Sequence, residues 1–252
     1  MAKQKGIIKL EGTIGDITFY KSQQEGFLAR GKGGVSADRI ATDPNFQRTR
    51  ENGAEFGAAG KAGKVLRKAF RGLLQNVSDL RMVSRLTKEM VKVLQMDATN
   101  PRGQRNVIDG EAELLQDFEF NINGELGFTL NAPYTATIDR VAGTLTVDIP
   151  SFIPQKKIAA PDGTTHFKIV SSGAEVDFEN KKFVVDDQES AVLPWDKNAT
   201  AAINLANAVT ANSTHPLFLA LGIEFYQQVN GQMYSLLNGS FNPLSLVKVL
   251  GL

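Results

Sequence analysis

The stretch Leu217-Phe218-Leu219-Ala220-Leu221-Gly222-Ile223-Glu224-Phe225 continues to Val229, turns at Asn230-Gly231 and resumes from Met233 through Leu237. An Asn-Gly pair between two β-prone runs is the strongest short-range hairpin signal, because both residues accept the positive φ angles of a tight turn. The sequence therefore predicts two antiparallel strands joined at Asn230-Gly231, with a last strand at Leu244–Leu250.

The same alternation of apolar and polar residues begins at about residue 112. Asn123-Gly124 predicts another hairpin, between strands at 118–122 and 126–130. Further strand candidates follow at 134–138, 145–149, 166–170, 182–185 and 202–209. Many short strands at this spacing predict an antiparallel β-sandwich.

Upstream of the strands, the apolar period changes to that of helices. Asp43-Pro44 predicts the start of a helix that runs to about Gln75, and Ser78-Asp79 predicts the start of a second, to about residue 96. Gly53, Gly57 and Gly60 share one face of the first helix, which predicts a groove where another backbone lies close. The alternative is that this stretch is not helical and that Asn52-Gly53 is a turn.

Residues 6–30 form a separate β-rich segment at the N-terminus. Its pieces are 6–10, 13–20 and 27–30, and strands this short need a partner sheet, in the same chain or in a neighbour. The prediction is an α+β chain with a β-arm at 1–34, a basic helical module at 35–105 and an acidic β-sandwich domain at 106–252.

The charges follow this division. Residues 1–105 hold 20 lysines and arginines against 10 acidic residues, whereas residues 106–252 hold 8 against 17. The basic half is expected to engage either an external polyanion such as nucleic acid or the acidic half, within one chain or between successive copies. A third interpretation is that each domain has a solvated face of one sign.

The 252 residues include no cysteine and two histidines. Disulfides, thiolate zinc sites and cysteine nucleophiles are thereby excluded, and histidine-based metal sites and triads have few parts. Asp177 and Glu179 leave open a carboxylate pair for glycoside chemistry. We expect no cofactor, no enzyme activity and no membrane span, and cytoplasmic synthesis without a signal peptide. The final location stays open.

The motif Gly12-Thr13-Ile14-Gly15-Asp16-Ile17-Thr18-Phe19-Tyr20 is followed by Ala29-Arg30, Gly33-Gly34, Arg48-Thr49-Arg50-Glu51-Asn52 and Glu55-Phe56-Gly57. It resembles uncharacterised proteins of Bacteroidota, in which a short β-opening precedes an Arg-rich helix and a β-rich region. The resemblance covers about the first 110 residues with some specificity. It implies a bacterial host and carries no activity.

The opposite charges and the unpartnered arm predict a non-catalytic structural protein that assembles head to tail into a tube, ring or filament, by charge complementarity and β-arm exchange. The alternatives are a nucleic-acid-binding protein that uses the basic helical face and a carbohydrate-active enzyme. The predicted assembly residues are Ile7, Ile8, Ile14, Phe19, Tyr20, Arg48, Arg50, Gly53, Gly57, Gly60, Lys64, Arg67, Lys68, Arg71, Asp186, Asp187 and Glu189.

Overall fold

The computed structural model describes residues 2–23, 25–31 and 33–252, in two compact units, Met1–Arg50 and Glu51–Leu252. Helices and antiparallel sheets make up 27% and 33% of the chain, which confirms the α+β class. The boundary between the two units lies inside the helix Gln47–Ala69. The three-part division at residues 34 and 105 stays a prediction.

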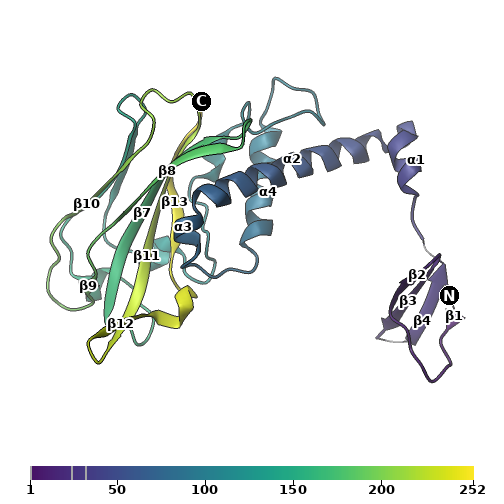
Figure 1. The fold of residues 1–252 in the computed structure, drawn as a ribbon, viewed down its shortest axis with the longest axis horizontal. Helices are drawn as coiled ribbons and strands as arrows, with labels where there is room; N and C mark the ends of the chain where they lie inside the picture. The colour runs from purple at the N-terminus through teal and green to yellow at the C-terminus, as the bar shows by residue number, and fades with distance from the viewer. Residues whose placement is uncertain (1, 24, 32) are drawn as a thin grey trace. The chain divides into compact units, whose positions relative to one another are not determined.

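The first unit contains a small antiparallel sheet with the order β1-β4-β3-β2 (Figure 1). Its strands are β1 (Ala2–Lys3), β2 (Gly12–Ile14), β3 (Ile17–Ser22) and β4 (Gly26–Gly31). The predicted strand at 6–10 is wrong, because this segment is a loop in which the Gln4 side chain holds the backbone of Leu10 and Leu28. Helix α1 (Ala37–Thr42) and the short η1 (Pro44–Phe46) follow.

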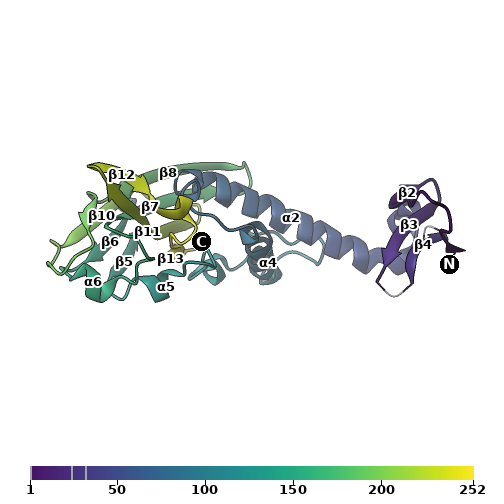
Figure 2. The same cartoon turned by 90° about the horizontal axis from the view of Figure 1, so that it is seen from below.

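The second unit contains two antiparallel sheets. The larger has the order β12-β11-β7-β8, with β13 also paired to β11 and β9 to β7, and the smaller has the order β10-β6-β5 (Figure 1 and Figure 2). The strands are β5 (Thr135–Asp139), β6 (Thr144–Ile149), β7 (His166–Asp177), β8 (Lys182–Glu189), β9 (Leu193–Pro194), β10 (Ile203–Ala208), β11 (Leu217–Val229), β12 (Gln232–Ser235) and β13 (Leu244–Leu250). The hairpin at Asn230-Gly231 is confirmed, since Val229 pairs with Gln232 across a turn with φ of 50° and 79°.

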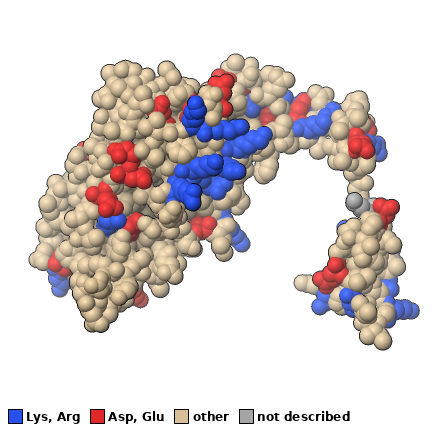
Figure 3. Space-filling view, in the orientation of Figure 1, with Lys and Arg blue, Asp and Glu red and all other residues tan. Residues whose placement is uncertain are grey.

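Three helices of the second unit pack beside the large sheet. They are α2 (Gln47–Ala69), α3 (Arg71–Leu74) and α4 (Met82–Gln95). Helix α2 continues through Gly53, Gly57 and Gly60, so the helical interpretation of the glycine stretch is confirmed and the turn at Asn52-Gly53 is wrong. Lysines and arginines gather over α2 on its outer side, as the blue patch in Figure 3 shows.

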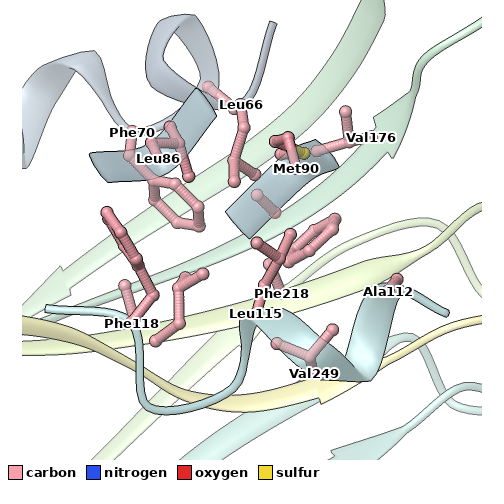
Figure 4. Close-up of a cluster of buried hydrophobic side chains, with 14 of the residues drawn as sticks. Leu66, Phe70, Leu86, Met90, Ala112, Leu115, Phe118, Val176, Phe218 and Val249 are labelled. Carbon is pink, nitrogen blue, oxygen red and sulfur yellow. The ribbon is translucent and has the colours of Figure 1, made fainter. Parts of the chain in front are cut away.

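The large sheet is covered on both faces because the side chains of β11 alternate between two cores. Phe218 and Ala220 pack with α2, α4 and the short η2 (Ala112–Leu115), in the cluster of Figure 4. Leu219 and Leu221 pack into a second cluster with side chains of β6 and β10. The antiparallel sheets are thus shown, while the finer class of a β-sandwich stays a prediction.

The predicted strands at 118–122 and 126–130 are wrong. Residues 126–129 form one helical turn, α5 (Leu126–Thr129), and residue 119 makes only an isolated bridge to Ser245. The reason is a set of side-chain hydrogen bonds, one local and two long-range: Asn121 Oδ1 accepts the backbone N–H of Asn123, while Asn121 Nδ2 donates to the carbonyls of Ser240 and Asn242. The turn at Asn123-Gly124 therefore packs against the loop before β13 instead of joining two strands.

The remaining elements are the short helix α6 (Pro154–Lys157) and η3 (Leu236–Gly239). None of the helices in the described part of the chain is long and apolar enough to cross a membrane.

Phe218 offers a test of the core between α2, α4 and β11. Its side chain is fully buried and meets the ring of Phe178 edge to face, with the centroids 6.1 Å apart. We expect Phe218→Ala to lower the free energy of unfolding by about 3–5 kcal/mol, because the cavity does not refill. Phe128→Ala, at a side chain that is 78% exposed, should change it by less than about 0.5 kcal/mol. Urea unfolding measures both, and equal effects would contradict this packing.

Candidate interaction surfaces

The N-terminal sheet carries an apolar face that its own unit does not cover. Ile14 pairs with Ile17, and Phe19 pairs with Ala29, so these four side chains and Phe27 lie on one face of the sheet. Ile14 is 63% exposed and Ile17 is 47% exposed, and the other three are half-buried. Leu28 is the only buried hydrophobic side chain among the described residues of the unit. We call Ile14, Ile17, Phe19, Phe27 and Ala29 the arm face.

Two lysines border the arm face. The ammonium groups of Lys9 and Lys21 lie 5.9 Å and 5.5 Å from the ring centroid of Phe27. Such contacts leave the cations in solvent beside an apolar surface. Two arm faces packed together would bring like charges close, so the arm face fits an apolar surface with carboxylates around it better than it fits itself.

The other predicted arm residues lie elsewhere. Tyr20 is on the opposite face of the sheet, where it pairs with Leu28 and lies 5.2 Å from the guanidinium of Arg30. Ile7 and Ile8 belong to the loop between β1 and β2, where they are 103% and 79% exposed. The structure therefore brings Ile14 and Phe19 together and separates Tyr20, Ile7 and Ile8 from them.

Arg50 has a structural role within the first unit. Its Nη1 donates to the carbonyls of Ile40 and Asp43, at 2.6 Å and 3.0 Å, where α1 ends. Arg48 is exposed. The two arginines thus differ, although the sequence placed them in one motif.

Two of the three predicted glycines line a groove on the second unit. Gly53 and Gly57, with Ala54 and Ala58 on the same helix, form one wall of a space of about 580 Å³. Val107 and Phe178 lie opposite them, and Lys61, Glu179 and Lys181 are at its rim. A Cβ atom at Gly53, Gly57 or Gly60 would meet nothing within 4 Å. Gly60 is not among the residues that line the groove, so only two of the three predicted glycines face it. We call this space the glycine groove.

Four predicted cations of α2 and α3 lie together. Lys64, Arg67, Lys68 and Arg71 line a second groove of about 350 Å³, with Leu74, Gln75 and Met82 beside them (Figure 3). Within the described part of the chain, none of the four side chains has an ion-pair or hydrogen-bond partner. We call Lys64, Arg67, Lys68 and Arg71 the cation row.

The predicted acidic residues of β8 are mostly engaged inside the chain. The Asp186 carboxylate accepts the backbone N–H of Ala208 at 2.8 Å, and Glu189 pairs with Lys168 at 2.7 Å. Asp187 lies next to α3, since a Cβ on Gly72 would be 2.7 Å from its Oδ2 atom. The basic and acidic halves thus meet within one chain at this point, beside the cation row.

No sequence motif singled out Glu224, which is buried, or Glu119, which is partly buried. Glu224, the one charge in the long apolar run of β11, accepts from Asn76 Nδ2 at 2.6 Å and pairs with Lys168 at 3.2 Å, which links the helices to the sheet. Burial, with the Glu224 carboxylate, raises the pKa of the Tyr226 hydroxyl to about 12. In the sequence, the only sign of this buried charge was the position of Glu224 among apolar neighbours.

Glu119 lines a cleft of about 450 Å³ with Arg85, Lys88, Asp117 and Glu125. Burial raises the pKa of its carboxyl to about 7, and the nearby charges of Glu125 and Asp117 add to the shift. Its Oε1 accepts the backbone N–H of Leu126, whereas Oε2 is buried without a hydrogen-bond partner. Its position between the apolar Phe118 and Phe120 was the only signal in the sequence.

The structure separates the carboxylate pair that glycoside chemistry would need. Asp177 faces a cleft with Glu175 and His215, while Glu179 is at the rim of the glycine groove. Asp177 also accepts from the backbone and side chain of Asn180, which closes the turn. Among residues 2–23, 25–31 and 33–252, no three His, Asp or Glu side chains gather in a way that could hold a metal ion.

Glu119 predicts a pH dependence of stability. Because its folded pKa of about 7 exceeds its ordinary value of about 4.3, the folded chain holds an extra proton between these values, and the free energy of unfolding falls as the pH rises through them. We expect Glu119→Gln to remove this pH-dependent fall in the free energy of unfolding. The stability of the variant relative to wild type should therefore be higher above about pH 7 than at low pH. Urea unfolding across this range measures it, with the exposed Glu179→Gln as the control. An unchanged slope in Glu119→Gln would contradict the assignment.

No family model, no curated protein and no solved structure matches this chain. The resemblance to proteins of Bacteroidota therefore stays a prediction, and the surfaces themselves carry the functional argument.

Proposed function

We propose that this chain is a non-catalytic structural protein that assembles with copies of itself through its N-terminal sheet. The observation that supports this most is the arm face, where Ile14 and Ile17 are exposed on a sheet whose unit has almost no core. Covering a side chain of this size contributes about 1.5–3 kcal/mol. A four-stranded sheet gains this stabilisation only by packing against another surface.

A second copy offers a surface of the required charge. Residues 106–252 hold 17 acidic residues against 8 basic ones, so the acidic half of one copy attracts the lysines at the border of the arm face of another. Contact between two different surfaces is heterologous, and its repetition generates a ring, tube or filament. The predicted head-to-tail arrangement follows from this asymmetry.

The face of the arm offers more surface than its edges. The edge strands β1 and β2 have two and three residues, so few backbone groups are open to pairing with another strand. We therefore propose face packing as the main contact of the arm, with strand exchange as a smaller part. The glycine groove, lined by Gly53 and Gly57 and with a volume of about 580 Å³, offers a place for a segment of a neighbour.

The finer description of the second unit belongs to the same proposal. We take its two antiparallel sheets to form the predicted β-sandwich, because Leu145 and Val147 of β6 pack with Leu219 and Leu221 of β11 in one core. A carbohydrate-active enzyme has less support, since Asp177 and Glu179 line different clefts.

Ile14→Asp tests the arm face. A carboxylate there cannot be covered by an apolar surface, and the change should weaken self-association by about tenfold or more, equivalent to at least about 1.4 kcal/mol. Sedimentation velocity over a micromolar concentration series measures the assembly.

Thr13→Asp is the matched control, because Thr13 is exposed on the same strand and pairs with Thr18 on the opposite face. It adds the same charge and should leave assembly close to that of wild type. A wild-type chain that stays monomeric throughout the series, or equal losses in the two variants, would sink the proposal.

A further inference from the structure

We propose that the cation row of α2 and α3 binds the phosphate backbone of nucleic acid, without reading its sequence. The inference concerns Lys64, Arg67, Lys68 and Arg71, and it is independent of the arm face. Three features of the described residues support it: the row is unpaired, its spacing suits consecutive phosphates, and many carboxylates of the acidic half are engaged by their own chain.

The row gathers four adjacent cations without an ion-pair or hydrogen-bond partner among the described residues. Lys61, Arg81 and Lys88 also lack such a partner there, but they do not line this groove. On α4, Arg85 pairs with Asp79 at 2.5 Å and donates to the carbonyl of Glu119, and Lys92 pairs with Glu89 at 2.6 Å. The four side chains of the row have no such contacts among the described residues. Four adjacent unpaired cations repel one another, and an external anion relieves this repulsion.

The geometry of the helix gathers the four charges into a short stripe. Positions 64, 67, 68 and 71 fall within about 100° of arc at 3.6 residues per turn and span about 10 Å along the axis. The backbone N–H of Phe70 donates to the carbonyl of Leu66, and that of Leu74 donates to the carbonyl of Phe70. Helical hydrogen bonds therefore continue from α2 into α3. Because the phosphates of one strand follow one another at about 3.4 Å along the axis of a duplex, the length of the stripe corresponds to about three phosphates of one strand.

The acidic half of a second copy fits the row less well. Many of its carboxylates accept hydrogen bonds from groups of their own chain: Asp148 from Asn204, Glu175 from Thr210, and Asp196 from Asn198. Asp186 and Glu189 are engaged in the same way. Withdrawing these carboxylates would break existing hydrogen bonds, whereas phosphate oxygens arrive with only their counterions to release.

The character of the groove points to backbone contact without base readout. Leu74, Gln75 and Met82 line it beside the cations, and no aromatic side chain is among its lining residues. Stacking on aromatic rings, which single-strand binders commonly use, is therefore not supplied by the groove itself. Binding through charge alone is tolerant of sequence and steeply dependent on salt.

The test is fluorescence anisotropy with short labelled single-stranded and duplex DNA of unrelated sequences, titrated with the full chain. About three phosphate contacts predict that log K falls with log salt at a slope of about −2 for single strands and about −3 for duplexes. Changing Lys64, Arg67, Lys68 and Arg71 together to Gln should remove most of this slope and lower affinity at least tenfold at low salt.

The matched control changes Lys156, Lys157, Lys197 and Lys248 to Gln, since these side chains are also exposed and the net charge falls equally. It should bind nearly as wild type does, and Ile14→Asp should bind while failing to assemble. Circular dichroism confirms that the variants fold. Undetectable wild-type binding at low salt, or equal losses in both quadruple variants, would overturn the inference. A third result would also overturn the inference: self-association that salt weakens and that only the cation-row variant loses. This result would mean that the cation row binds an acidic surface of a second copy.

Discussion

Strand β11 is the element on which the second unit depends, because both of its faces must be covered by apolar side chains. Phe218 and Ala220 face the helices, and Leu219 and Leu221 face the small sheet. Neither face can be left in water, since each leucine or phenylalanine left exposed forgoes about 1.5–3 kcal/mol. Burial of apolar side chains therefore holds the helices against the large sheet. Attraction between the basic helices and the acidic β-rich half is not needed for this contact.

This requirement also determines where the charges lie. Leu66 and Phe70 must face Phe218, so α2 can turn only one stripe inward, and its lysines and arginines are directed to solvent. Many acidic side chains are instead held by their own chain: turns supply N–H donors to Asp177 and Asp196, and strand β10 supplies one to Asp186. The large difference in formal charge between the halves thus becomes an exposed basic stripe and an acidic half in which many carboxylates are satisfied internally.

The parts of the fold that the sequence predicted are those in which local signals and burial agree. The hairpin at Asn230-Gly231 and the helical interpretation of the stretch with Gly53, Gly57 and Gly60 are both confirmed. The strands predicted at 118–130 fail because side-chain hydrogen bonds from Asn121 and Glu119 override the alternation. No periodicity reports such bonds, which depend on loops more than 100 residues away in the chain.

For the candidate surfaces, the sequence identified residue types but not their pairing. The predicted basic helical module contains the cation row and also Arg85 and Lys92, and only the structure shows that Arg85 and Lys92 are paired with Asp79 and Glu89. The sequence grouped Phe19 with Tyr20, which a strand must place on opposite faces. Partners of a charged side chain lie far along the chain, so composition predicts an excess of charge but not the atoms that carry it unpaired.

The two surfaces differ in the physical effect on which they depend, and this makes them separable. Contact at the arm face combines burial of Ile14 and Ile17, which strengthens or holds as salt is added, with attraction of the border lysines to carboxylates, which salt weakens. Contact at the cation row is driven by release of counterions, which salt suppresses. A chain that uses both would hold its copies together under conditions that release nucleic acid.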